Sequence, residues 1–441
     1  MSAPRQLNVL VNDRLIGKLA SDNDLWSFTY DDAWQKWPEA FSLAPGLPMT
    51  QLAHVDGSSN RPVQWYFDNL LPEEALRSVL SKEANLDEAD AFALLAHFGA
   101  ESAGSLVLIT PDAAAAKTGL IPLSLQELHL RIKNLPQATL AKHSPKRMSL
   151  AGAQHKMVVV YKNEQLFEPE TGTASTHILK PNSLSADYPA SVMNEFFTMK
   201  LARAVGLDVP DVYRVYAPEP AYIVERFDRV EVDGTARRQH IIDTCQLLNK
   251  SRSFKYAQAN LQTLGEAIEQ CTAKAAARLQ LYRWVLFNFF VGNADNHLKN
   301  ISFRISHEGV RLAPAYDLLC TAVYDTAGFA QQKPNWPHVE LALPLDGATH
   351  FGHVKRSTLL SAGAALGLAK ATVARELASM AGALPTQADK LLTEIEEAFN
   401  ALIQLSPDPD AAKLHKGGEL RLARAIRYVI LKDTIAMAQQ P

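Results

Sequence analysis

The stretch Gly292-Asn293-Ala294-Asp295-Asn296-His297-Leu298-Lys299-Asn300 places a carboxylate at Asp295 and an amide at Asn300, and a second carboxylate follows at Asp317 within Ala315-Tyr316-Asp317-Leu318. In phosphoryl transfer from a nucleotide, one Asp orients the attacking hydroxyl, while an Asn and a later Asp bind Mg²⁺ beside the phosphates. Because positioning and charge neutralisation dominate this reaction, a few side chains can suffice. The stretch therefore predicts a kinase-type site.

The segments on either side of this stretch support the same prediction. An apolar helix is expected over 275–291, and Ile301-Ser302-Phe303-Arg304-Ile305 is typical of a short strand. Helix, polar loop, strand and then Asp is the order in which kinase-type folds present their catalytic and metal-binding residues. An ordinary loop, in which Asp and Asn cap turns, is the alternative. His297 has no His-x-x-x-His or Cys partner for a hydrolytic metal site, so we expect it to order the loop through a hydrogen bond.

Two charged residues earlier in the chain extend this order. Lys180 ends the apolar strand Thr176-His177-Ile178-Leu179-Lys180, and Glu195 lies on an amphipathic helix expected over 190–205. Kinases hold the α- and β-phosphates with a strand lysine that pairs with a helix glutamate. A surface lysine beside a solvated helix face is the alternative for these residues alone. Together with the three residues named above, they follow the order found in kinases, which favours the functional interpretation.

Two weaker motifs fit nucleotide binding. Val224-Glu225-Arg226-Phe227-Asp228 follows a strand, where an adenine can pair with backbone groups and Phe227 can supply an apolar wall; a strand-end cluster of salt bridges is the alternative. Ser149-Leu150-Ala151-Gly152-Ala153-Gln154-His155-Lys156 contains small residues that let backbone N–H groups approach phosphate oxygens. It lacks the Walker A spacing, and a plain turn is the alternative. Lys146 and Arg147 could neutralise a phosphate on Ser149.

The composition is that of a soluble globular protein. Of 441 residues, 47% are hydrophobic and 21% are charged, and the net charge of −3 gives the whole surface no general attraction for nucleic acid or membrane. The three cysteines have no paired spacing, which argues against a disulfide framework or a zinc site and for a reducing cytoplasm. We find no apolar signal segment and no apolar run long enough to cross a bilayer. We therefore expect a cytoplasmic protein without a membrane partner.

The chain is too long for one ordinary core, and its patterning predicts three parts. Short alternating strands followed by helices predict an N-terminal module over residues 1–112, and a Pro-, Ala- and Thr-rich linker follows it. A β-rich lobe at 123–250 and a helical lobe at 251–441 come next. The predicted fold is α+β, with two kinase-like lobes (a β-rich N-lobe and an all-helical C-lobe) and an added β-meander and helix module. Helices of the C-lobe are expected over 275–291, 359–381, 387–405 and 420–438.

Taken together, these segments resemble the HipA family of bacterial serine/threonine kinase toxins over nearly the whole chain. Each motif alone is modestly specific, but several motifs in the family's order make the resemblance strong. They are Tyr66-Phe67-Asp68-Asn69-Leu70-Leu71-Pro72-Glu73, Gly99-Ala100-Glu101-Ser102-Ala103-Gly104, and the segments at 149–156, 176–180, 224–229, 295–300 and 316–318.

The resemblance implies a role for each matched residue. Asp295 would be the catalytic base, Asn300 and Asp317 would bind Mg²⁺, and Lys180 would contact the phosphates of ATP. Ser149 would be autophosphorylated, which would expel the phosphate loop and switch the kinase off. The nucleotide site would comprise a phosphate loop of Ala151, Gly152, Ala153, Gln154, His155 and Lys156, an adenine connector of Glu225, Arg226 and Phe227, and a remaining pocket of His297, Leu298, Lys299, Asn300 and Tyr316.

The resemblance also implies partners. Family members are encoded beside a small helix-turn-helix antitoxin of the HipB type, and the pair binds operator DNA, mainly through the antitoxin. Their protein substrates include aminoacyl-tRNA synthetases, notably the glutamyl enzyme. Phosphorylation of such a translation factor would arrest growth and produce persistence.

Two segments depart from the family pattern, and two other functions use the same residues. His155 stands where some relatives carry an acidic residue. Residues 327–337 match no pattern, although their place after Asp317 suggests a part in choosing the substrate.

As alternatives, the kinase fold could be a non-catalytic scaffold for a helix-turn-helix repressor, or the site could phosphorylate a small molecule, as aminoglycoside-type kinases do.

Overall fold

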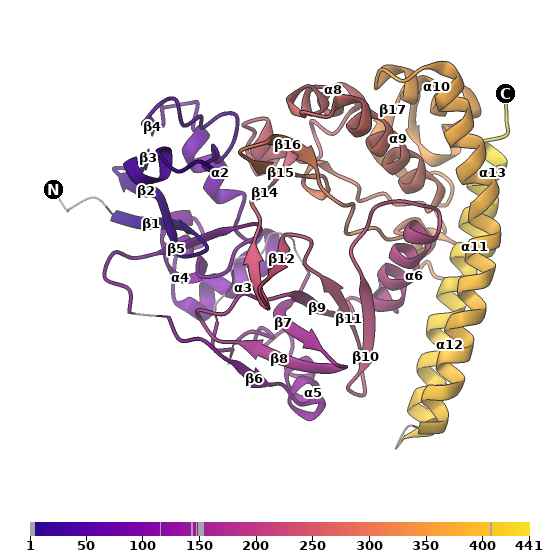
Figure 1. Cartoon of the computed structure of the whole chain (residues 1–441). Helices are drawn as coiled ribbons and strands as arrows, with labels where there is room; N and C mark the ends of the chain where they lie inside the picture. The colour runs from indigo at the N-terminus through magenta and orange to yellow at the C-terminus, as the bar shows by residue number, and fades with distance from the viewer. Residues whose placement is uncertain (1–4, 115, 143, 147, 149–153, 406–407) are drawn as a thin grey trace. The chain divides into compact units, whose positions relative to one another are not determined.

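The computed structural model describes residues 5–114, 116–142, 144–146, 148, 154–405 and 408–441. The chain forms two compact units, each assembled from separate stretches of sequence. Unit 1 comprises residues 1–180, 224–255 and 302–313, and unit 2 comprises residues 181–223, 256–301 and 314–441. Both units mix helices and strands, which confirms the predicted α+β class (Figure 1). The sequential division at residues 112, 123 and 250 stays a prediction.

Unit 1 begins with an antiparallel sheet in the order β4-β3-β2-β1-β5. Alternate residues of its strands, such as Val9, Ile16 and Phe28, are fully buried, because successive side chains of a strand point to opposite faces. The predicted N-terminal meander is therefore confirmed. The elements of this part are β1 (Arg5–Val11), β2 (Arg14–Asp22), β3 (Leu25–Tyr30), α1 (Asp32–Gln35), β4 (Ala53–Val55), α2 (Pro62–Asp68), α3 (Glu74–Ala84), α4 (Ala91–Phe98) and β5 (Leu106–Ile109).

Three further groups of strands complete unit 1. One sheet contains the neighbouring strands β9-β7-β8-β6, a second has the order β14-β15-β16, and β12 and β13 form a hairpin. The strand predicted after the polar loop is confirmed as β15. The elements are β6 (Leu120–Pro122), α5 (Leu125–Lys133), β7 (Met157–Lys162), β8 (Gln165–Pro169), β9 (His177–Pro181), β12 (Arg229–Val232), β13 (Thr235–Arg238), β14 (Ile241–Asp243), α7 (Thr244–Leu247), the 3₁₀ turn Arg252–Phe254, β15 (Ser302–Ser306) and β16 (Gly309–Leu312).

Unit 2 is mainly helical, with α9 in its core. Tyr282, Phe287 and Phe290 of α9 are fully buried, and α9 confirms the helix expected over 275–291. The elements are α6 (Ser191–Ala204), β10 (Val212–Tyr216), β11 (Pro220–Glu225), which ends in unit 1, α8 (Leu261–Gln270), α9 (Lys274–Phe290), β17 (Glu340–Leu345), β18 (Ala348–His350), α10 (Arg356–Ala365), α11 (Lys370–Leu405), α12 (Pro409–Ala425), α13 (Leu431–Met437), the 3₁₀ turns Leu298–Asn300, Ala322–Asp325 and Phe351–His353, and the π-helical turn Ile426–Ile430. The hairpin β17–β18 was not anticipated from the sequence.

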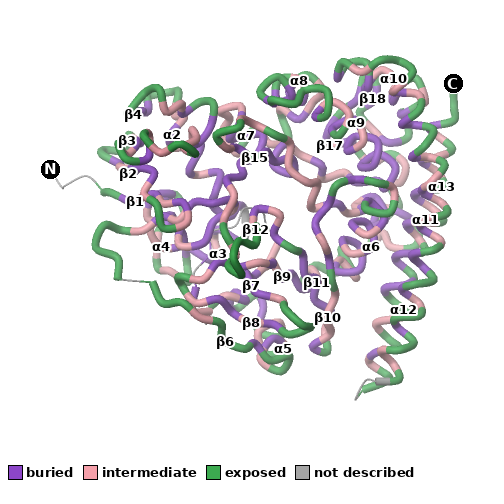
Figure 2. The backbone as a smooth tube through the Cα atoms, in the orientation of Figure 1, coloured by how far each residue is buried: buried purple, intermediate pink, exposed green. Residues whose placement is uncertain are grey.

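The C-terminal helices differ in their bounds from those expected. The helix predicted over 359–381 is divided, because Gly367 adopts a φ of 82° and ends α10, with its N–H donating to the Ala364 carbonyl at 2.9 Å. The next helix, α11, runs through Pro385 without the gap expected at 382–386. The fully buried Leu384 and Ala388 on either side offset the hydrogen bond that proline cannot donate. Figures 1 and 2 show α11 beside α12, with buried and exposed residues alternating along both helices.

Two absences concern the described part of the chain alone. In it, no helix is both long enough and apolar enough to cross a membrane. The three cysteines, Cys245, Cys271 and Cys320, all lie within it as buried thiols outside any disulfide. Burial raises the pKa of Cys271 to about 11 and also raises the pKa of Cys320.

A buried cluster of charges joins distant stretches of unit 1. The carboxylate of Glu101, fully buried, contacts Lys146, Arg226, Arg229 and Arg238 at N···O distances of 2.7–2.9 Å. Although burial alone would raise it, these four cations hold the pKa of Glu101 well below its usual 4.5, so the side chain remains ionised. Segments separated by more than a hundred residues are therefore fixed to one carboxylate.

We predict that Glu101→Gln destabilises the protein by about 3–5 kcal/mol, because the amide keeps the shape of the side chain but leaves buried cations uncompensated. Urea denaturation should show a lower midpoint than in the native protein. Glu39→Gln, which changes an exposed carboxylate of the same unit, is the control and should leave the midpoint unchanged. Equal midpoints for the two variants would contradict the proposed role of the cluster.

Candidate active site

A chain of buried amides sets the position of Asp295 at the end of α9. The Nδ2 of Asn288, inside the helix, donates to the Trp284 carbonyl at 2.8 Å, and its Oδ1 accepts from Asn293 Nδ2 at 2.7 Å. Asn293 Oδ1 in turn accepts from the backbone N–H of Asp295 at 3.0 Å. The sequence showed Asn288 only as an interruption of an apolar run, yet this residue fixes the backbone that carries the predicted base.

Gly292 makes the turn between α9 and the polar loop. Its φ is 66°, in the left-handed region that favours glycine. A Cβ at this position would lie 2.9 Å from Ile430 Cγ2 and 3.0 Å from Ala322 Cβ, which is too close for either neighbour. The loop can therefore pack against both segments only because residue 292 has no side chain.

Asn300 closes the loop that Asp295 begins. Its Nδ2 donates to the Asp295 carbonyl at 2.9 Å, so the nitrogen end of the amide is used within the loop and the oxygen end is directed elsewhere. The hydroxyl of Tyr316 donates to the Lys299 carbonyl at 2.5 Å, which brings the segment before Asp317 to the same loop. The structure thus places Asp295, Asn300 and Tyr316 together, whereas the side chain of Leu298 is fully buried.

The segment that carries Asp317 is held by α6 and by the loop. Asn194 of α6 forms a reciprocal pair with Cys320: Asn194 Nδ2 donates to the Cys320 carbonyl at 2.8 Å, and the Cys320 N–H donates to Asn194 Oδ1 at 2.7 Å. Thr321 Oγ1 accepts from the Ala294 N–H at 2.6 Å. Asp317 itself has a φ of 55°, an uncommon conformation for a residue with a side chain, which points to a positional constraint.

Glu195 and Asp317 both influence the buried hydroxyl of Tyr222. Burial of its side chain raises the pKa of Tyr222 well above 10, and the negative charges of Glu195 and Asp317 raise it further. Both carboxylates therefore act on the same buried hydroxyl. Four of the predicted residues, namely Glu195, Asp295, Asn300 and Asp317, thus belong to unit 2, and a hydrogen bond joins Asn300 to the backbone of Asp295.

Tyr256 is a site residue that the sequence analysis missed. Its hydroxyl donates to Asp295 Oδ1 at 2.5 Å, and its ring lies 4.9 Å from the His297 ring in an edge-on arrangement. Tyr256 precedes Asp295 by 39 residues and belongs to no motif, so no local signal in the sequence indicates this contact. The hydrogen bond orients the carboxylate that we predict to be the base.

The other predicted nucleotide-binding residues lie in unit 1. Lys180 is buried at the end of β9, so the alternative of a surface lysine is wrong. Because Glu195 belongs to unit 2, its pairing with Lys180 stays a prediction. For Arg226 the alternative of a strand-end salt-bridge cluster is the correct one. Its guanidinium donates to Glu101 and Asp228 in the buried charge cluster. Any contact of residue 226 with a nucleotide is thus left to its backbone, and Glu225 and Phe227 keep their predicted roles as predictions.

The predicted phosphate loop is described only in part. Gln154, His155 and Lys156 are half-buried residues leading into β7, and burial lowers the pKa of His155 below 6.5. Ser149, Ala151, Gly152 and Ala153 lie outside the described residues.

The donor set on the polar loop suits a hard cation better than a soft one. Among the described residues, no group of three or more His, Cys, Asp or Glu side chains is arranged to hold a metal ion. Mg²⁺ does not need such a group, because it binds one or two protein oxygens and takes its other ligands from phosphates and water. Asn296 Oδ1 is buried on this loop without a hydrogen-bond partner, which marks an oxygen that a bound group could use.

Comparison with known proteins matches both parts of the chain to family models. Residues 7–109 match the HipA N-terminal domain, and residues 148–401 match the HipA-like C-terminal domain. The putative kinase Y4mE of Sinorhizobium fredii is 37% identical over 335 residues, covering 73% of this chain and 78% of that protein. The serine/threonine-protein kinase toxin HipA of Shewanella oneidensis is 30% identical over 449 residues, covering 97% of each protein.

A solved structure extends the similarity to the fold. It contains HipA and HipB of a Shewanella oneidensis toxin–antitoxin system with their operator DNA. The matched chain superposes with a TM-score of 0.74 at 26% sequence identity, covering 98% of this chain and 99% of that one.

We predict that Tyr256→Phe lowers the rate of phosphoryl transfer by about 10-fold, because Asp295 loses the hydrogen bond that orients it while the ring against His297 is kept. Steady-state kinetics should show the loss in kcat, with the KM for ATP unchanged. Tyr428→Phe removes another tyrosine–aspartate hydrogen bond of unit 2, that to Asp389, and should have no effect. A native rate for Tyr256→Phe would rule out the orienting role.

Proposed function

The chain belongs to the HipA family of serine/threonine-protein kinase toxins, and we propose that it transfers the γ-phosphate of ATP, with Mg²⁺, to a serine or threonine hydroxyl of a protein. The polar loop of unit 2 is the observation that supports this mechanism most directly. There the Asn300 amide donates to the Asp295 carbonyl, and Tyr256 binds the Asp295 carboxylate. A carboxylate and an amide oxygen are thus held at fixed places on one short loop, as phosphoryl transfer requires.

In this proposal Asp295 accepts the proton of the attacking hydroxyl and aligns that hydroxyl with the γ-phosphate. Asn300 and Asp317 hold Mg²⁺, for which the oxygen end of the Asn300 amide is suited because the nitrogen end is bonded within the loop. When bound, Mg²⁺ neutralises charge on the phosphates. The Asn194–Cys320 pair keeps the backbone after Asp317 in place during the reaction.

The remaining predicted residues bind the nucleotide in this proposal. Lys180 contacts the phosphates, and its burial in β9 restricts its motion. The backbone at 225–227 pairs with the adenine. Residues 151–156 form the phosphate loop, and His297, Leu298, Lys299 and Tyr316 complete the pocket, with Leu298 acting from within the core.

We further propose that the chain is the toxin of a toxin–antitoxin pair. The similarity to the HipA of a HipA–HipB–operator complex supports a helix-turn-helix antitoxin of the HipB type as its partner, with operator DNA bound mainly through that antitoxin. The protein substrate in this proposal is a translation factor such as an aminoacyl-tRNA synthetase, for example the glutamyl enzyme. Its phosphorylation would stop growth and lead to persistence.

Two other functions make different demands on the same site. A non-catalytic scaffold for a repressor needs no ordered Asp295, whereas the hydrogen bonds described above order it from two sides. A small-molecule phosphotransferase would act on low-molecular-weight hydroxyl compounds without any protein acceptor. Incubation with labelled ATP, Mg²⁺ and each class of acceptor distinguishes the three functions.

We predict that Asp295→Asn lowers phosphoryl transfer by at least about 10²–10³-fold, because the amide cannot accept the hydroxyl proton. Nucleotide binding and the urea midpoint should stay near those of the native protein, since the backbone bonds of the loop are unchanged. Asp346→Asn, at an exposed position of unit 2, serves as the matched control. Full activity in a well-folded Asp295→Asn protein would remove the proposed base.

We also predict that Ser149→Ala abolishes labelling of the chain by its own activity while transfer to a protein acceptor persists or rises. The reason is that the negative charge of a phosphate beside the phosphate loop would interfere with nucleotide binding. Lys146 is not available to neutralise that charge, as the sequence suggested, because its side chain is buried and paired with Glu101. Phosphopeptide mapping after incubation with labelled ATP locates the modified residue. Immediate loss of transfer to other proteins in Ser149→Ala would oppose a purely inhibitory role.

A further inference from the structure

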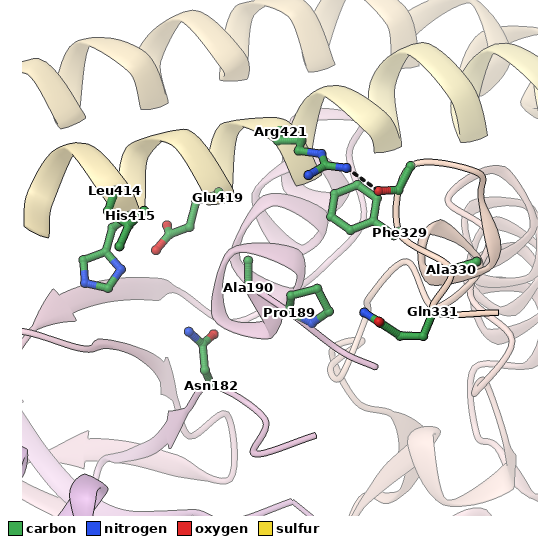
Figure 3. A pocket seen from close by; sticks show the side chains of 12 residues that line it. Asn182, Pro189, Ala190, Phe329, Ala330, Gln331, Leu414, His415, Glu419 and Arg421 are labelled. Carbon is green, nitrogen blue, oxygen red and sulfur yellow. Dashed lines mark hydrogen bonds between the residues drawn. The ribbon is translucent and has the colours of Figure 1, made fainter. Parts of the chain in front are cut away.

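A pocket of about 470 Å³ lies in unit 2 against α12, and none of the predicted site residues lines it (Figure 3). Its walls come from three stretches of the chain. Pro189 and Ala190 precede α6, Phe329 belongs to the segment after Asp317, and Gly418 and Glu419 lie on α12. Residues 328–331 of the wall fall within the segment 327–337 that the sequence left without a pattern.

A buried ion pair forms one wall of the pocket. Glu419 Oε2 accepts hydrogen bonds from Arg214 Nη1 at 2.8 Å and from the Tyr216 hydroxyl at 3.0 Å. The Arg214 guanidinium also lies 4.3 Å from the Phe196 ring centroid and 5.2 Å from that of Phe399. These contacts hold the carboxylate of Glu419 at a fixed place on the wall of the pocket.

The other oxygen of this carboxylate is not satisfied. Glu419 is only 3% exposed, and its Oε1 is buried without a hydrogen-bond partner. Figure 3 shows the carboxylate pointing from α12 toward the space beside Ala190. A buried charged group that lacks a partner destabilises the fold, so a donor entering the pocket would relieve that cost.

Charge in the pocket favours a cationic donor. Burial raises the pKa of Glu419 above 4.5 even though Arg214 lowers it, so the present partners compensate its charge incompletely. Burial lowers the pKa of His415, which leaves that ring largely neutral near pH 7. Arg421 is held aside: it donates to the Gly328 carbonyl at 2.5 Å and lies 5.0 Å from the Phe329 ring centroid.

The wall of the pocket also contains apolar side chains. Leu414 on α12 is 77% exposed, and Phe329 lines the pocket from the segment after Asp317. Gly418, on the same helix, leaves its side of the wall open, since a Cβ there would meet nothing within 4 Å. A long aliphatic stem with a charged head matches such a site, because the stem covers apolar surface while the head reaches the carboxylate.

We propose that this pocket binds a lysine or arginine side chain of the protein substrate, with the stem against Leu414 and Phe329 and the cationic head on Glu419. The proposal rests on the kinase function proposed above and adds a determinant of substrate choice to it. Two facts favour the substrate as occupant. The wall contains Gly328, eleven residues after the proposed metal ligand Asp317, and Arg421 ties that segment to α12.

The first experiment measures binding without ATP, on the full-length protein with ¹³C-labelled leucine and alanine methyl groups. Nα-acetyl-lysine methylamide should shift the Leu414 and Ala190 methyl signals saturably, with an affinity at least about 10-fold above that of the uncharged norleucine analogue. Gly418→Leu, which fills the pocket, should abolish the shifts. Gly417→Leu, at a neighbouring glycine that also meets nothing within 4 Å but does not line the pocket, should keep them.

The binding experiment has clear negative outcomes. Each of three results would overturn the proposal that the pocket binds a cationic side chain. They are the absence of saturable shifts, equal affinity for the norleucine analogue, and unchanged lysine binding in Gly418→Leu. Glu419→Gln should lower lysine binding by about 10-fold, whereas Glu397→Gln, an exposed carboxylate on α11, should leave it unchanged. Gly418→Leu leaves the Arg214–Glu419 pair intact, so the test does not depend on the folding of Glu419→Gln.

The second experiment connects the pocket to substrate choice. Serine peptides in which one position at a time is lysine, arginine or norleucine are phosphorylated by the native protein and the same variants. The native protein and Gly417→Leu should prefer a basic residue at one fixed position by about 10-fold in kcat/KM. Gly418→Leu should lose this preference while transferring to the norleucine peptides at the native rate.

The two proposals fail in different ways. A preference that survives in both Gly418→Leu and Glu419→Gln would exclude the pocket from substrate recognition. If the native protein transfers phosphate to no acceptor, the proposed function is refuted, and the substrate role of the pocket is refuted with it. Lysine binding in the methyl spectra is scored independently of transfer, so it still decides whether the pocket is a cation site.

Discussion

The carboxylate of Glu101 holds together stretches of unit 1 that are far apart in the sequence. Removing one carboxylate from water is unfavourable by several kcal/mol, and the fold tolerates it because four cations converge on it. Ser175, just before β9, also donates to Glu101, at 2.6 Å. The segment that leads into β9 and the segment at Arg226 are therefore positioned by electrostatic contacts within unit 1.

Unit 2 uses neutral groups for the equivalent task. Asn288 and Asn293 pass hydrogen bonds from the interior of α9 to the backbone of Asp295, and Asn194 pairs with the backbone at Cys320. An amide both donates and accepts, so a buried amide can satisfy a backbone group and remain satisfied itself. The amides thus position the backbone at Asp295 and at Cys320, close after Asp317, without adding charge to this part of unit 2.

The sequence predicted those features whose signal is local. The strands of the first sheet alternate with a period of two, α6 and α9 were predicted to within about one residue, and the proposed catalytic residues lie in short motifs. The missed features depend on contacts between distant residues. Tyr256 contacts Asp295 although 39 residues separate them in the sequence, and Glu419 forms its buried ion pair with the distant Arg214. Pro385 does not end the helix as the sequence predicted, because the packing of buried neighbouring residues outweighs the loss of one backbone hydrogen bond.

Because Cys245, Cys271 and Cys320 are buried, none of the three thiols is exposed to reagents in solution. Thiolates are the reactive form, and burial disfavours that form at Cys271 and Cys320. A cysteine introduced at an exposed position such as Leu414 would therefore be the preferred target of a maleimide dye or nitroxide. A single spectroscopic probe can thus be attached to α12 without first replacing the three native cysteines.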